Sequence, residues 1–225
     1  MQIFVKSIIG IILIPFVWGL LVSFWKLVVP LFPLGSSEIW FISGFAFFFV
    51  IFLIKPLPNR FYIFGHELTH AFWAILFRGR VREFNVHSKT GSVLTTKSNF
   101  LISLAPYFFP IYTFLIIAVF YLLVFFVDVA KYIEWLFLLV GVSYSFHIFL
   151  TFDSLSVGQS DIKKTGRIFS YIVIFMLNLV MAVVVLKFVS PDKVFLKKYV
   201  INSKNTATEI YRYLVFYLQF FIFFV

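Results

Sequence analysis

Long runs without charged residues alternate along this chain of 225 residues with short basic or proline-containing connections. A membrane-spanning helix needs about 20 predominantly apolar residues. Runs that approach or exceed this length, each predicted to form a helix, lie at 7–25, 39–54, 99–127, 135–152 and 168–186. Within the 99–127 run, Pro106 and Pro110 should kink or delay the helix, because proline cannot donate an intrahelical hydrogen bond.

Two further segments extend this pattern. Residues 61–77 are apolar on both sides of a short polar cluster, and the proline-broken connection 55–60 precedes them. The uncharged run 213–225 could complete a seventh span if its helix begins near Thr206, or it could lie along the membrane interface. The expected fold is therefore an all-α integral membrane bundle of six to seven spans, with the first span retained rather than cleaved as a signal peptide.

The pattern changes between the 61–77 helix and the 99–127 run. Residues 81–87 and 92–96 read as two short strands around a turn that contains Gly91. We therefore predict a short β-hairpin directly after the 61–77 helix. The alternative interpretation is a solvated basic loop.

Composition supports a membrane protein. The chain is 62% hydrophobic and 12% charged, whereas a soluble domain is about half apolar and about a quarter charged. Its length fits one compact transmembrane domain over residues 1–225. A net charge of +10 would suggest nucleic acid in a soluble protein, but here it fits basic loops that face the head groups of a lipid bilayer, and no nucleic-acid partner is expected. The absence of cysteine excludes disulfides and thiolate metal sites.

The polar cluster in the 61–77 helix has the spacing of a zinc-hydrolase motif. Residues 66–70 read His-Glu-Leu-Thr-His. Because residues four apart share one helical face, His66 and His70 can bind one Zn²⁺. Glu67 is the candidate catalytic base, placed to accept a proton from metal-bound water. Ionisable side chains are costly in hydrocarbon, which favours this function over polar helix–helix contacts without a metal.

A catalytic zinc site usually has three protein ligands, so a third must come from elsewhere. We favour Asp161, because Gly158 and its polar neighbours can break the helix and let the carboxylate turn towards the metal. Asp153 and His147 are the next candidates, and His87 in the hairpin is expected to face solvent. The alternative role for Asp161 is a loop carboxylate that pairs with nearby lysines.

Phe64–Ala71 resembles the site-2 protease family of intramembrane zinc metalloproteases and, more narrowly, the small bacterial membrane metallopeptidases grouped near that family. The resemblance covers about residues 59–180, and further blocks carry it: the predicted hairpin, Leu104–Phe108, Gly158–Asp161 and Gly166–Ser170. In that family a distal aspartate, usually followed by glycine, completes the zinc site. Here Ile162 follows Asp161.

The resemblance implies an enzyme of the bacterial inner membrane that hydrolyses peptide bonds of membrane proteins or membrane-associated peptides. Zinc would be held by His66, His70 and Asp161, with Glu67 as general base. An extended substrate segment could add as a strand to the hairpin. A non-catalytic metal-binding scaffold or sensor that retains the fold is the alternative. The intact Glu67 argues against that alternative, because metal binding alone requires no base.

Overall fold

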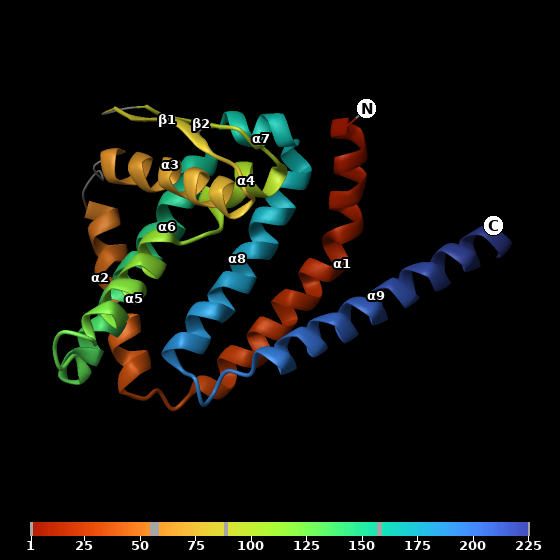
Figure 1. The fold of residues 1–225 in the computed structure, drawn as a ribbon. Helices are drawn as coiled ribbons and strands as arrows, with labels where there is room; N and C mark the ends of the chain where they lie inside the picture. Colours follow the sequence, from red (N-terminus) through yellow and green to blue (C-terminus); the bar gives the residue numbers. More distant parts are fainter. Residues whose placement is uncertain (1, 55–58, 88–89, 157–158, 225) are drawn as a thin grey trace. The chain divides into compact units, whose positions relative to one another are not determined.

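The computed structural model describes residues 2–54, 59–87, 90–156 and 159–224, and it is mostly helical (80%) (Figure 1). Parts of three predicted features lie outside the described residues: the connection at 55–58, the hairpin turn at 88–89, and Gly158. The chain divides into two compact units. The central unit is Leu34–Thr165, and the terminal unit combines Met1–Pro33 with Gly166–Val225.

In the central unit, helix α2 (Ser36–Ile54) packs along helix α6 (Ile133–Ser156). Glycines allow the two backbones to approach closely: Gly44 lies against the Leu138 carbonyl and Gly141 against the Phe41 carbonyl. Small residues serve this purpose wherever apolar helices cross at short range. Beyond this crossing, Phe149 of α6 stacks on Phe49 and Phe52 of α2.

Helix α3 (Asn59–Leu76) leads into the predicted hairpin, which consists of β1 (Val81–Val86) and β2 (Gly91–Thr95). The strands pair antiparallel, with Phe84 opposite Val93 and Val86 opposite Gly91. Both strands contact α3, and the Phe84 ring meets Phe64 of α3 edge to face. The hairpin prediction is confirmed, and the hairpin lies directly on the helix that carries the His-Glu-Leu-Thr-His motif.

The 99–127 run is a broken helix, as its prolines predict. Helix α4 (Phe100–Leu104) continues into the 3-10 helix η2 (Ala105–Tyr107), and α5 (Ile111–Leu123) follows at an angle of 79°. The Asn99 side chain caps α4 by accepting a hydrogen bond from the Ile102 amide. A 3-10 helix, η3 (Ala130–Tyr132), precedes α6, and the short α7 (Ser160–Thr165) packs against α4.

In the terminal unit, α1 (Gln2–Val28) continues into η1 (Val29–Leu31) and packs against both α8 (Arg167–Val189) and α9 (Leu196–Phe224). The last helix begins at Leu196, earlier than the start near Thr206 that was the condition for a seventh span. The charged stretch after residue 196 remains helical because Tyr199, Ser203 and Ala207 form a buried stripe at intervals of one turn. Gly19 of α1 lies against this stripe.

Four helices in the described part of the chain are long and apolar enough to cross a membrane, or five if the bent pair α4–α5 is one span. They are compatible with a membrane protein. Neither α3 nor α9 is among them, because each carries several charged or strongly polar side chains. The expectation of six to seven spans therefore stays a prediction.

Candidate metal centre

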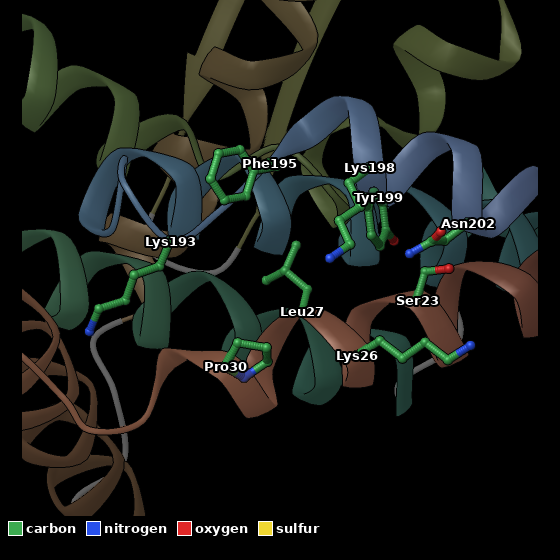
Figure 2. A pocket seen from close by; sticks show the side chains of 9 residues that line it. All are labelled: Ser23, Lys26, Leu27, Pro30, Lys193, Phe195, Lys198, Tyr199 and Asn202. Atoms are coloured by element: carbon green, nitrogen blue, oxygen red, sulfur yellow. The ribbon is translucent and has the colours of Figure 1, made fainter.

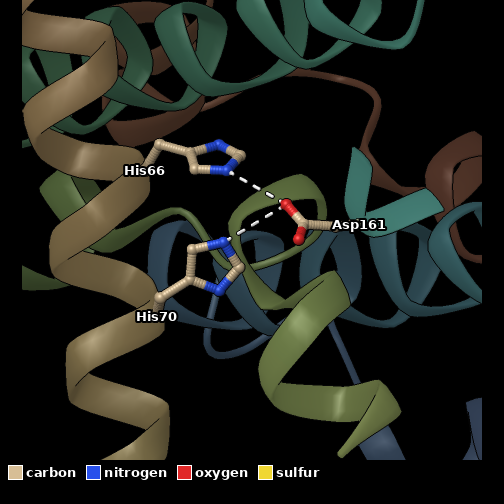
Figure 3. A group of neighbouring side chains, drawn as sticks. All are labelled: His66, His70 and Asp161. Carbon is tan, nitrogen blue, oxygen red and sulfur yellow. Dashed lines mark ion pairs between the residues drawn. The ribbon is translucent and has the colours of Figure 1, made fainter. Parts of the chain in front are cut away.

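Helix α3 presents His66 and His70 on one face, and Asp161 of α7 lies opposite them (Figure 3). The Oδ2 atom of Asp161 is 3.8 Å from His66 Nε2 and 3.5 Å from His70 Nε2. One potential ligand atom from each residue lies within 4.8 Å of the other two. The two side chains four residues apart therefore converge with one carboxylate that is distant in sequence.

This donor set fits a zinc ion. Tetrahedral coordination with metal–ligand bonds of about 2.0–2.1 Å puts neighbouring ligand atoms roughly 3.3 Å apart. The two nitrogen–oxygen separations, 3.5 and 3.8 Å, are close to this spacing. Three protein ligands leave a fourth position for water or substrate, which is the composition of a catalytic rather than a structural zinc site.

The carboxylate is held in place by the short helix α7. Ile162 and Thr165 are buried, and they anchor α7 beside α4 while Asp161 turns towards the histidines. Burial alone would raise the pKa of the Asp161 carboxyl, but the interactions with His66 and His70 outweigh it and hold that pKa well below its usual range. Asp161 is therefore a carboxylate at neutral pH, the form that binds metal ions.

A hydrogen bond fixes the orientation of His70. Its Nδ1 atom donates to the Ile102 carbonyl of α4 over 2.8 Å, which leaves Nε2 as the ring nitrogen that faces Asp161. In a continuous α-helix the Ile102 carbonyl would accept from the amide of residue 106. That residue is Pro106, which has no N–H, so the carbonyl is available to His70. Pro106 was recognised in the sequence only as a kink.

Two tyrosines support the other ligands. The Tyr62 hydroxyl lies 3.5 Å from His66 Nδ1, one helical turn earlier on α3. Tyr107 is fully buried; its ring meets His66 edge to face, and its hydroxyl lies 3.5 Å from Asp161 Oδ2. Partners of this kind orient metal ligands. Sequence reasoning missed both roles, although Tyr62 precedes His66 by one turn and Tyr107 directly follows Pro106.

The buried Glu67 lies beneath the start of strand β2. A β-carbon at position 91 would come within 2.7 Å of Glu67 Cγ and 2.8 Å of its Oε1 atom. Only glycine at this position lets the strand rest on the Glu67 side chain. The hairpin therefore covers the candidate base directly.

The remaining candidates lie apart from this group of ligand atoms. Asp153 is exposed on α6, and His87 is exposed after β1. Lys163 and Lys164 are also exposed, and among the described residues the ion pairs of Asp161 are with the two histidines.

His147 of α6 lines a small cavity beside His66, together with Tyr62 and Tyr112. The cavity measures about 20 Å³, which suffices for one water molecule. It is too small for a peptide side chain.

Comparisons of the chain with protein-family models, curated proteins and solved structures find no match. The resemblance to site-2 proteases therefore rests on the sequence blocks described above.

The role of Pro106 can be tested by restoring the missing amide. Pro106→Ala should supply a donor that competes with His70 for the Ile102 carbonyl. We expect zinc affinity to fall about 10-fold, since loss of an orienting partner costs about 10–100-fold. Competition against a chromophoric chelator measures this affinity. Pro110→Ala is the matched control, because it alters the same bend without adding a donor for Ile102. Equal affinities in all three proteins would contradict the proposed role.

Proposed function

We propose that this protein is a zinc metalloprotease that cleaves peptide bonds of membrane proteins or membrane-associated peptides, similar to the site-2 protease family. The convergence of His66, His70 and Asp161, with Glu67 on the same helix, carries the proposal. Each ionisable residue of the motif would then have a chemical role, and the third ligand would be the carboxylate that the family resemblance implies.

The two imidazoles and the carboxylate would hold the ion through His66 Nε2, His70 Nε2 and one Asp161 oxygen. When bound, zinc supplies a Lewis acid that makes water a nucleophile near neutral pH and polarises the scissile carbonyl. Asp161 offsets one of the two positive charges. Hydrogen bonding at Nδ1 keeps a proton on that nitrogen of His70, so Nε2 is the atom that would bind the ion.

Glu67 would move the proton in this reaction. Its carboxylate accepts a proton from the attacking water and later delivers it to the leaving amine. Its burial supports this role, because bulk water is largely kept from the carboxylate. The contact with Gly91 restricts where the carboxylate can point, so the proton acceptor is preorganised.

The hairpin offers a way to present a substrate. Peptide amides within a helix are engaged in their own hydrogen bonds, so a helical segment must become extended before it is cleaved. A two-stranded sheet can accept an extended peptide along an edge by main-chain hydrogen bonding. Because β2 begins at Gly91 on top of Glu67, a peptide added to this sheet would run close to the base.

The setting of the reaction follows from the apolar helices. Helices α2 and α6 of the same unit are long and apolar enough to cross a bilayer. A protease anchored in this way meets membrane-associated substrates first. We place it in the bacterial inner membrane on the strength of the family resemblance.

Glu67→Gln separates catalysis from metal binding. The amide keeps the shape of the carboxylate but cannot accept a proton, so zinc content should stay near that of the unaltered protein while cleavage falls at least about 100-fold. The assay uses proteoliposomes that contain a single-span reporter peptide with a fluorophore–quencher pair, and zinc is measured by elemental analysis. Undiminished cleavage by Glu67→Gln would exclude Glu67 as the base. No cleavage by either protein, with zinc retained, would favour the non-catalytic metal-binding alternative.

The third ligand is tested by comparing two aspartates. Asp161→Asn should lower zinc affinity by more than the roughly 10–100-fold typical of an orienting partner, and activity should be lost with it. Asp153→Asn is the matched control: the same substitution is made on an exposed side chain, and both quantities should stay within about twofold. A larger loss of zinc from Asp153→Asn than from Asp161→Asn would overturn the ligand assignment.

A further inference from the structure

A second polar cavity lies in the terminal unit, between the end of α1 and the beginning of α9 (Figure 2). Its volume is about 130 Å³, whereas about 10–15 Å³ suffices for a water molecule. The cavity therefore has room for a group of several heavy atoms. Its lining residues are Ser23, Lys26, Leu27, Pro30, Lys193, Phe195, Lys198, Tyr199 and Asn202.

Two residues that line this cavity have buried hydroxyls without a hydrogen-bond partner in the described part of the chain. Ser23 is 2% and Tyr199 is 4% exposed, and neither hydroxyl has a hydrogen-bond partner within the described part of the chain. A buried polar group without a partner is costly, so such groups are rare and usually meet a water, an ion or a ligand. Burial raises the pKa of Tyr199 to about 12, so its hydroxyl stays protonated and can donate a hydrogen bond. The Asn202 amide lies on the same stretch of α9 (Figure 2).

The positive charge around the cavity favours an anionic ligand. Lys26 lies in the last turn of α1 and Lys198 in the first turn of α9. Lys193 also lines the cavity, and its ammonium donates to the Leu31 and Pro33 carbonyls. No acidic side chain is among the described lining residues. The amino end of α9 adds the positive end of a helix dipole.

The location and the apolar lining favour a lipid over a free ion. The cavity adjoins the last turns of the candidate span Ile3–Leu31, the depth at which head groups meet a bilayer-spanning helix. Leu27, Pro30 and Phe195 form apolar walls that can accept the start of an acyl chain. The exposed Trp25 ring is typical of the same interfacial depth. Basic pockets between membrane helices at this level bind anionic head groups.

We propose that this cavity binds the phosphate of an anionic glycerophospholipid. Lys26 and Lys198 provide the charge, and the Ser23 and Tyr199 hydroxyls donate hydrogen bonds to phosphate oxygens. The bound lipid would join α1 to α9 within the terminal unit. The site is independent of the candidate metal centre, which lies in the central unit.

The test uses the full-length protein in detergent, titrated with dioleoyl-phosphatidylglycerol or dioleoyl-phosphatidylcholine and followed by native mass spectrometry. Phosphatidylglycerol should bind more tightly. Lys198→Ala should weaken its binding about fivefold, the contribution typical of one lysine near an anionic surface. Lys197→Ala is the matched control, since this exposed neighbour does not line the cavity. Equal losses in the two lysine variants would overturn the site.

Tyr199→Phe tests the buried hydroxyl without removing the ring. If a lipid phosphate uses this hydroxyl, the variant should lose part of the thermal stabilisation that phosphatidylglycerol gives to the unaltered protein. If the cavity has no such ligand, the stabilisation should be unchanged, which would contradict the proposal. Millimolar inorganic phosphate that displaces the lipid and stabilises the protein equally would show a free-phosphate site and overturn the lipid assignment. Equal binding of both lipids would have the same consequence.

Discussion

The hydrogen bond from His70 to the Ile102 carbonyl links the broken helix to the helix that carries the motif. It is possible because Pro106 leaves that carbonyl without its intrahelical donor. The same break turns the chain so that Tyr107 contacts both His66 and Asp161. Helix α7, which carries Asp161, packs on the short helix that contains Ile102. The orientation of His70, the position of Tyr107 and the packing of α7 therefore all depend on where α4 ends.

A general constraint explains why the centre is built this way. Polar groups among apolar helices must find partners within the protein, because no water is at hand to replace them. Some polar side chains of the central unit do so: Ser145 donates to the Phe45 carbonyl, and the Thr113 and Ser143 hydroxyls pair with each other. The buried Thr151 hydroxyl has no partner among the described residues. The unpartnered hydroxyls of Ser23 and Tyr199 are further exceptions among the described residues, and the lipid site proposed for them would satisfy the same constraint.

Much of the fold could be predicted from the sequence, because apolar runs and alternating strands are local patterns. The helices, the hairpin and the bend at Pro106 and Pro110 are of this kind. The early start of α9 was missed because its buried stripe shows its purpose only against Gly19 of α1.

The features of the candidate metal centre likewise fall into those that follow from local sequence spacing and those that depend on tertiary packing. The relation of His66 to His70 follows from helical spacing. The approach of Asp161 rather than Asp153 depends on how α7 packs, which residue spacing alone did not decide. The contact of Gly91 with Glu67 is also tertiary, and nothing in the strand pattern distinguishes that glycine from an ordinary turn residue.

The central claim is that one zinc ion is held by two imidazoles and a carboxylate, and X-ray absorption at the zinc edge of the purified, metal-loaded protein tests it most directly. The account predicts about one zinc per chain, a spectrum with two imidazole ligands and the rest oxygen, and loss of most of the zinc from a His66→Ala, His70→Ala double variant. Stoichiometric zinc retained by the double variant, or a spectrum without imidazole, would contradict it.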